Sequence, residues 1–289
     1  MKRTLFTGAC TALVTPFSNG QINYPMLEKL LARQLNAGIK AVVLSGTTGE
    51  SPTLTDSEKL ELFTRAKAFV GSDCMIIAGT GSNSTAHAIA LSIAAEQTGV
   101  DALLIVSPYY NKATSDGLIA HYTAIAEAVS IPMILYNVPS RTGLDIQVNV
   151  YRKLCQIPKI AGVKEASPDL AKIARIKNAC SPDFAVWSGN DDLAVPVISL
   201  GGSGVISVLS NVCPVEVSAM VNAALDGDMD TATALQLQLQ PLCDLLFCEV
   251  NPIPVKEAMD CIGFDCGECR LPLCRLSKEN QKRIRDFFA

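Results

Sequence analysis

Lys164 ends a short apolar segment, residues 160–163, and its position points most directly to chemistry. An amine at the end of a buried strand is partly desolvated, which favours its neutral form and makes it nucleophilic. Because a neutral amine attacks a carbonyl group, the position predicts Schiff-base chemistry at Lys164. The alternative is a lysine that buries only its aliphatic stem and pairs its ammonium with Glu165, and position alone favours neither interpretation.

Other polar residues follow other apolar segments in the same way. They include Thr47, Thr48, Ser51, Tyr109, Tyr110, Tyr136 and Arg141, and Gly189 lies in a segment of the same kind after another strand. Tyr136 can transfer protons if Thr47 hydrogen-bonds its hydroxyl, and a tyrosine that only packs is the alternative. The planar guanidinium of Arg141 suits a carboxylate, and a solvated loop arginine is the alternative. His87 and His121 lie inside expected helices, which argues against a histidine-based mechanism.

Eight apolar, β-rich segments alternate with amphipathic segments along most of the chain. The expected strands are 9–14, 41–44, 75–78, 102–106, 133–136, 160–164, 185–188 and 204–207. The expected helices are 24–37, 55–69, 84–98, 116–128, 147–155, 170–180, 193–200 and 215–225. This pattern predicts an α/β fold, a closed (β/α)8 TIM barrel, in which polar residues after the strands meet at one face. A doubly wound open sheet is the alternative, but residues 15–17 lack the glycine-rich turn that it would need.

After residue 225 the strand pattern ends. We expect helices at 229–248, 254–262 and 278–288, which form a small C-terminal helical domain over 226–289 beside a catalytic barrel over 1–225. Prolines at 252 and 254 break the helical pattern between the first two of these helices. Because the segment has little core of its own, we expect it to pack on the barrel. Helix caps are expected at Thr55, Asn83, Ser167 and Ser277.

Composition excludes several classes of function. Of the 289 residues, 49% are hydrophobic and 18% are charged, and the formal net charge is −4. Without a basic block, binding to nucleic acid or to an anionic membrane is not expected. No apolar run approaches the roughly 18 residues of a membrane-spanning helix, and no signal-peptide cleavage site is clear. We therefore expect a cytoplasmic protein whose eleven cysteines are reduced thiols.

Four of the cysteines gather near the C-terminus, at Cys261, Cys266, Cys269 and Cys274. The spacing between Cys266 and Cys269 is that of a zinc knuckle, and four thiols can form a tetrahedral site. The outer spacings do not make two such pairs, so we favour a turn rich in small residues and expect no metal.

Four segments together resemble the dihydrodipicolinate synthase / N-acetylneuraminate lyase family, and the likeness extends along nearly the whole chain. They are Gly46-Thr-Thr-Gly-Glu50, Tyr136-Asn-Val-Pro139, Gly162-Val-Lys164 and Gly204-Val-Ile-Ser207. The resemblance strongly favours Lys164 as the Schiff-base residue. The sequence Ser140-Arg141-Thr142-Gly143 is similar to the synthase branch, whose arginine holds the carboxylate of L-aspartate 4-semialdehyde. Sugar-acid lyases usually carry an apolar residue in place of Arg141.

The resemblance implies a class I aldolase-type lyase that condenses pyruvate with L-aspartate 4-semialdehyde in diaminopimelate and lysine biosynthesis. The catalytic residues that it implies are Lys164, Tyr136, Thr47 and Tyr110. The substrate-binding residues are Thr48, Arg141, Ile206 and Gly189. No metal or organic cofactor is implied, because the lysine imine is itself the electron sink.

Within this family, Tyr110 would enter the site of a neighbouring subunit, which implies a homodimer and, by resemblance alone, a tetramer built as a dimer of dimers. Two other functions stay open. One is a sister lyase that acts on a sugar acid or another 2-keto acid, against which Arg141 argues. The other is a catalytically silent barrel with a binding role, against which the retention of Lys164 and Tyr136 argues.

A possible allosteric cleft comprises Ser51, Asn83, His87 and Tyr109. Ser51, Asn83 and Tyr109 match lysine-inhibited relatives, which carry an acidic residue in place of His87 and histidines in place of Asp56 and Lys59. A carboxylate is the natural partner of an amino-acid ammonium group. We therefore expect feedback by lysine to be weak or absent.

Overall fold

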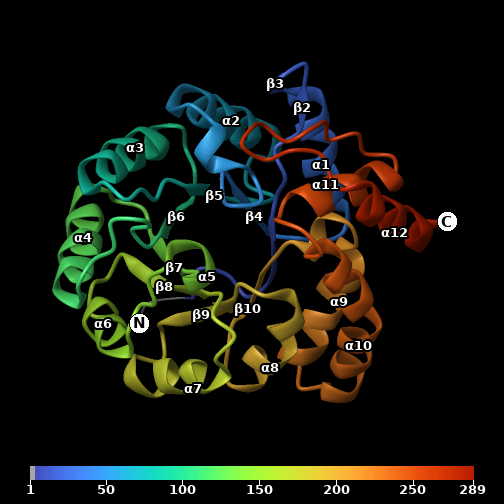
Figure 1. The fold of residues 1–289 in the computed structure, drawn as a ribbon. Helices are drawn as coiled ribbons and strands as arrows, with labels where there is room; N and C mark the ends of the chain where they lie inside the picture. The colour runs from blue at the N-terminus through green and yellow to red at the C-terminus, as the bar shows by residue number, and fades with distance from the viewer. Residues whose placement is uncertain (1–3) are drawn as a thin grey trace.

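The computed structural model describes residues 4–289 and is built on a closed barrel of eight parallel strands (Figure 1). In barrel order these are β1 (Gly8–Ala12), β4 (Ala41–Leu44), β5 (Met75–Gly79), β6 (Ala102–Val106), β7 (Met133–Asn137), β8 (Ile160–Glu165), β9 (Ala185–Ser188) and β10 (Gly204–Ser207). The barrel closes where β10 pairs with β1. The predicted TIM barrel is confirmed, and each strand begins and ends within two residues of its expected bounds.

A ring of helices surrounds the strands (Figure 1). They are α1 (Tyr24–Asn36), α2 (Asp56–Val70), α3 (Thr85–Gln97), α4 (Ser115–Ala128), α6 (Val148–Leu154), α7 (Leu170–Ala179), α8 (Ala194–Ser199) and α9 (Pro214–Leu225). Several short elements were not expected from the sequence. They are the hairpin β2 (Phe17–Ser18) with β3 (Gln21–Ile22), the helix α5 (Pro139–Thr142) and the 3-10 turns η1 (Ser51–Thr53), η2 (Asp191–Leu193) and η3 (Leu209–Asn211).

Alternation along the strands divides the core into two layers. Ile77 and Leu104 point into the barrel, whereas Ile76 and Leu103 point outward against the helices. Both sets are buried, which explains why the strands are continuous apolar runs in the sequence. A strand residue therefore reaches either the barrel interior or the helix layer, according to its position in the alternation.

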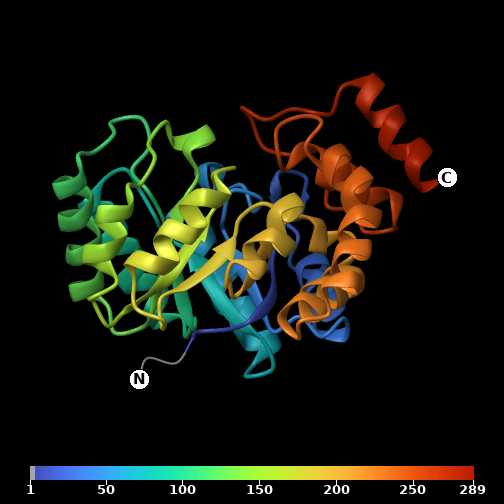
Figure 2. The same cartoon turned by 90° about the horizontal axis from the view of Figure 1, so that it is seen from below.

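A stacked aromatic pair packs at the N-terminal end of the barrel. Phe6, which precedes β1, stacks on the fully buried Trp187 of β9 with ring centroids 4.7 Å apart. Figure 2 shows the chain entering at this end, while the last helices lie toward the other. Open space for a ligand is therefore left at the C-terminal ends of the strands.

Helix caps agree with the sequence in two cases and differ in two. Thr55 begins α2 with a full capping box, and Ser277 caps α12. Ser84, not Asn83, caps α3, because its hydroxyl accepts from the backbone N–H of His87. Asp169, not Ser167, caps α7. A carboxylate placed directly before the first helical residue is better positioned to accept from the helix than a serine two residues earlier.

The C-terminal segment forms α10 (Met229–Leu246), α11 (Ile253–Cys261) and α12 (Lys278–Phe288). Helix α10 packs against α8 and α9 of the barrel ring. The Gln236 side chain fixes this contact, because it donates to the Asp191 carbonyl oxygen and accepts from the Val195 backbone N–H. A domain boundary between residues 225 and 226 stays a prediction. Among residues 4–289, no helix has both the length and the apolar character needed to cross a membrane.

Candidate active site

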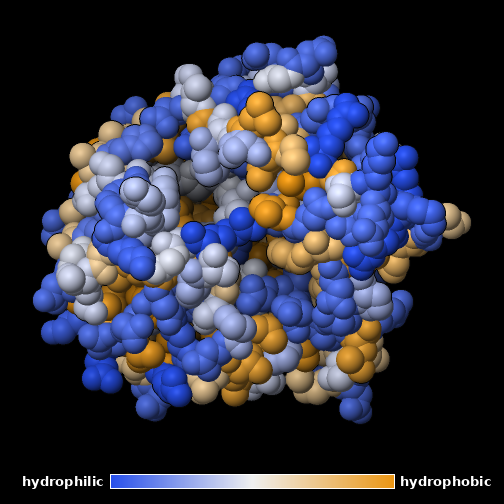
Figure 3. All heavy atoms as spheres, viewed as in Figure 1, coloured by the Kyte–Doolittle hydropathy of each residue, from blue (hydrophilic) through white to orange (hydrophobic). Residues whose placement is uncertain are grey.

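A cavity of about 730 Å³ opens at the C-terminal face of the barrel. Figure 3 shows the hollow near the centre of this face. Its walls come from the segments after β4, β5, β6 and β7 and from the C-terminal segment. Six of the residues expected to have functional roles line it: Thr47, Ser51, His87, Tyr109, Tyr136 and Arg141.

Lys164 and Tyr136 form an inward-facing pair on neighbouring strands. The register of β7 and β8 places Tyr136 opposite Lys164, and both side chains are buried. The Lys164 Nζ atom lies 4.5 Å from the centre of the Tyr136 ring. The adjacent Glu165 points out of the barrel and pairs with Lys172 instead. The alternative in which Lys164 is a structural partner of Glu165 is therefore wrong.

Gly189 makes room for the Lys164 side chain. A Cβ atom at Gly189 would lie 3.2 Å from Cε of Lys164 and 2.6 Å from Cβ of Ala166. The second distance is shorter than real Cβ contacts allow, so any larger residue would displace the segment after β8. Gly189 therefore leaves free the space beside the Lys164 side chain.

The segment after β4 carries both threonines. Thr47 is half-buried and lines the cavity, whereas Thr48 is buried and its hydroxyl oxygen accepts from Nδ2 of Asn251 at 3.0 Å. Glu50 ends this segment in a left-handed conformation, with φ of 56°. Its buried carboxylate lies 2.6 Å from Nζ of Lys256. Residues of the C-terminal segment therefore hold the threonine segment in place.

Arg141 lies on α5, at the exposed rim of the cavity. Its Nη2 atom donates to the backbone carbonyl oxygen of Asn251 at 3.4 Å. Asn251 thus contacts both Thr48 and Arg141. The sequence did not single out Asn251 or Lys256, because about 200 residues separate them from the segment that they support.

The other expected site residues are not among those that line this cavity: Lys164, Thr48, Gly189, Ile206, Tyr110 and Asn83. Ile206 is buried inside the barrel on β10, and Tyr110 is 92% exposed with φ of 69°.

Asp191, after β9, accepts from the backbone N–H groups of Val208 and Leu209 at 2.9 and 3.0 Å. Burial raises the pKa of Asp191. These bonds fix the turn that follows Ile206, a role that the sequence alone did not indicate.

Three of the four expected allosteric residues, Ser51, His87 and Tyr109, line the cavity, whereas Asn83 does not. Nε2 of His87 lies 2.8 Å from an Asp56 carboxylate oxygen, and Nδ1 lies 3.1 Å from the Ser82 hydroxyl. Lys59 Nζ lies 3.9 Å from a carboxylate oxygen of Asp56. Burial lowers the pKa of Lys59. The polar atoms of the His87 ring are therefore engaged within the chain.

The four C-terminal cysteines differ strongly in exposure. Cys266 is fully buried, Cys261 and Cys269 are half-buried, and Cys274 is exposed. Burial raises the pKa of the Cys266 and Cys269 thiols to about 12, which disfavours the thiolate form that metals bind. In the described part of the chain, no group of three or more histidine, cysteine or acidic side chains is arranged to hold a metal ion.

Comparison with known proteins agrees with the motifs at the strand ends. The profile of the Dihydrodipicolinate synthetase family matches residues 5–288. The chain is 44% identical over 291 residues to the 4-hydroxy-tetrahydrodipicolinate synthase of Acetivibrio thermocellus, with 99% of each chain covered.

Two solved structures superpose on this chain with a TM-score of 0.95. One is DHDPS from Cyanidioschyzon merolae with lysine bound, which is 41% identical, with 98% of this chain and 97% of that chain covered. The other is the chloride-inhibited dihydrodipicolinate synthase from Acinetobacter baumannii complexed with pyruvate, which is 40% identical, with 97% of each chain covered. The chain therefore belongs to the dihydrodipicolinate synthetase family.

Proposed function

We propose that the protein is a 4-hydroxy-tetrahydrodipicolinate synthase, which condenses pyruvate with L-aspartate 4-semialdehyde. The observation that carries this proposal is the Lys164–Tyr136 pair, with a buried amine beside a phenol at the C-terminal face of the barrel. Relatives over 40% identical along the whole chain carry this name, and one related structure holds pyruvate. The reaction serves the synthesis of diaminopimelate and lysine.

The first half of the reaction builds an enamine on Lys164. The neutral amine attacks the ketone carbon of pyruvate, and water leaves as the imine forms. Loss of a proton from the methyl carbon then gives the enamine. Tyr136 carries protons to and from these intermediates. Thr47, Thr48 and backbone groups near Ile206 hold the pyruvate carboxylate, and Gly189 keeps space open beside the lysine.

The second half of the reaction joins the two substrates. The enamine carbon attacks the aldehyde of L-aspartate 4-semialdehyde, and a carbon–carbon bond forms. Arg141 holds the carboxylate of this substrate at the cavity rim, because a guanidinium donates two parallel hydrogen bonds to a carboxylate. The amino group of the same substrate then attacks the imine carbon, which closes the ring and releases the Lys164 amine.

Tyr110 completes the proton relay in a neighbouring subunit. Its side chain is almost fully exposed and does not line the cavity of its own chain, as expected if it serves a partner. We therefore propose a homo-oligomer whose smallest active unit is a dimer, arranged as a tetramer of two such dimers, in the cytoplasm.

An aldehyde panel tests the proposed reaction. Purified protein is incubated with pyruvate, and product is followed with a coupled reductase after addition of L-aspartate 4-semialdehyde. N-acetylmannosamine and glyceraldehyde are run in parallel. Turnover with L-aspartate 4-semialdehyde alone is the expected result. Turnover with another aldehyde alone would assign the chain to the sister lyases and contradict the role of Arg141.

A further inference from the structure

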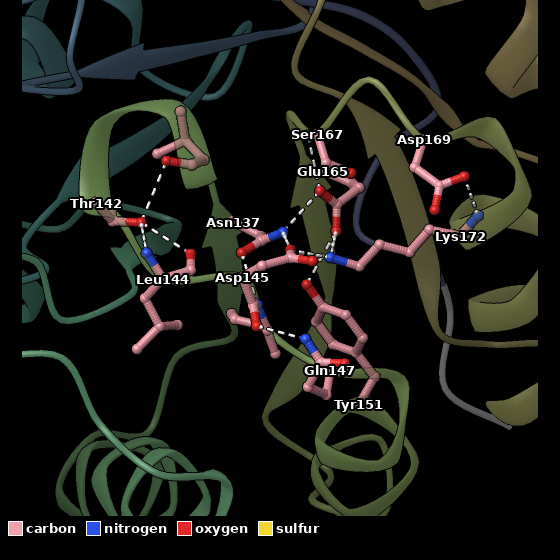
Figure 4. Close-up of polar contacts among 12 residues, drawn as sticks. Asn137, Thr142, Leu144, Asp145, Gln147, Tyr151, Glu165, Ser167, Asp169 and Lys172 are labelled. Atoms are coloured by element: carbon pink, nitrogen blue, oxygen red, sulfur yellow. Dashed lines mark hydrogen bonds and ion pairs between the residues drawn. The ribbon is translucent and has the colours of Figure 1, made fainter.

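A buried carboxylate lies directly behind the reactive lysine, on the outer face of β8. The Glu165 side chain has no exposed surface. It accepts from Nδ2 of Asn137 at 2.8 Å, from the Tyr151 hydroxyl at 3.0 Å and from the backbone N–H of Ser167 at 2.9 Å. Figure 4 shows these groups converging on it from β7, α6 and the segment after β8. A buried charge needs such partners, because each one offsets part of the lost hydration.

The contacts continue from Glu165 to the segment that follows α5. Nζ of Lys172 lies 3.4 Å from the second oxygen of Glu165 and also binds Asp145. Asn137 donates to Asp145 at 2.8 Å and accepts from the Ile146 backbone N–H at 3.1 Å. We call Asn137, Asp145, Tyr151, Glu165 and Lys172 the Glu165 cluster (Figure 4).

The cluster is joined to the inward-facing pair through the alternation of two strands. Asn137 directly follows Tyr136, and Glu165 directly follows Lys164. The strand register pairs Tyr136 with Lys164 and Asn137 with Glu165. Because successive side chains point to opposite faces, the hydrogen-bonded outer pair fixes the backbone that aims the inner pair.

We propose that Glu165 and Asn137 are positioning residues, which act through the backbone of β7 and β8 to hold the Lys164 amine against Tyr136. This inference rests on the proposed Schiff-base function and deepens it. Neither residue reaches the barrel interior, so both act without touching substrate. Asp145 extends the same support toward the segment that carries Arg141.

Apolar residues could also fill the space between β7, β8 and the helices, but the Glu165 cluster adds directional bonds there. Most of the contact between the strands and the helix layer is apolar, and such van der Waals contact has no directional bonds. Glu165 and Asn137 bond to four different chain segments, so they specify a position rather than only a volume. An orientation error of about 1 Å at a reacting group can cost on the order of 100-fold in rate.

The test compares Glu165→Gln with a matched control at the other end of the barrel. Asp101 also accepts from a lysine, Lys67, and from a backbone N–H, that of Ile76. Asp101→Asn therefore removes a carboxylate with the same two kinds of donor, although a more exposed one, without touching the cavity. The measurement is the rate constant of imine formation at saturating pyruvate, by rapid mixing and borohydride trapping, at a temperature where both variants are folded.

We expect Glu165→Gln to lower this rate constant at least ~10-fold, with the pyruvate KM changed less than ~3-fold. Asp101→Asn should leave both parameters near the wild-type values, even if it lowers the melting temperature as much. A merely structural role for Glu165 would lower the melting temperature alone. If Glu165→Gln does not fold, Tyr151→Phe decides, because it removes one hydrogen bond to Glu165 and should slow imine formation measurably.

If pyruvate is trapped on the wild type and folded Glu165→Gln forms the imine at the same rate, the positioning role is overturned but the proposed function is not. An absent adduct in the wild type would contradict the proposed function, and the positioning role with it.

Discussion

The ion pair between Glu50 and Lys256 connects the C-terminal segment to the threonine segment, and its removal should destabilise the whole molecule. The two side chains are 0% and 4% exposed, and their charged atoms lie 2.6 Å apart. Lys256→Met removes one charge with little change in volume. Glu50 then keeps the backbone N–H of Arg270 as a donor at 2.9 Å, but its charge is no longer compensated.

The expected loss of unfolding free energy is about 3–4 kcal/mol. Breaking a buried pair by removing one partner costs about 3–5 kcal/mol. The remaining bond from Arg270 reduces the cost, whereas loss of the cation–π contact between Lys256 and the Phe17 ring, at 4.3 Å, adds to it. Lys67→Met is the control, because its pair with Asp101 is more exposed and should be worth about 1 kcal/mol or less.

Equilibrium unfolding in urea measures these differences. A double variant, Lys256→Met with Glu50→Gln, should recover part of the loss, because no uncompensated charge remains. The buried pair does not have this role if Lys256→Met costs no more unfolding free energy than Lys67→Met, or if the double variant is less stable than the sum of the single effects predicts.

Three further predictions concern substrate binding, pH and regulation. Arg141→Leu should raise the KM for L-aspartate 4-semialdehyde by about 10–100-fold, since charge-assisted bonds are worth about 1.5–3 kcal/mol, without slowing imine formation. Hydrogen bonds from Arg270 lower the pKa of Glu58 from 4.5 to about 2. Stability from this pair is present above pH 4.5 and lost as pH falls toward 2. Unfolding free energy should therefore drop by roughly 2 kcal/mol more in the wild type than in Glu58→Gln between pH 6 and pH 2. Lysine below about 1 mM should leave the rate unchanged, because His87 is paired with Asp56 and supplies no carboxylate for an ammonium; clear inhibition would sink this idea.

Much of the barrel could be predicted from local sequence patterns. Strands such as β4, β6, β9 and β10 have the bounds expected from their apolar runs, because a strand buried on both faces is apolar throughout. The hairpin of β2 and β3 has two residues in each strand, which is too short for any periodicity. The caps at Ser84 and Asp169 were missed because a neighbouring residue in each case was also a good capping type.

The inner part of the site was also accessible from sequence, whereas its support was not. Lys164 and Tyr136 end apolar runs, so their place at the barrel mouth follows from the fold. Asn251 and Lys256 reach that site only through tertiary contacts, which no local pattern encodes. Glu165 shows a third case, because strand alternation could have placed it outside the barrel, but its partners on α6 and α7 could not have been identified.

Covalent capture of pyruvate tests the central claim most directly. Protein is treated with pyruvate and borohydride, digested, and analysed by mass spectrometry, with Lys164→Met and Lys67→Met as parallel variants. We expect one reduced pyruvate adduct, located on Lys164, absent from Lys164→Met and present in Lys67→Met, because Lys67 pairs with Asp101 away from the cavity. An adduct on another lysine, or none in the wild type, would contradict that claim.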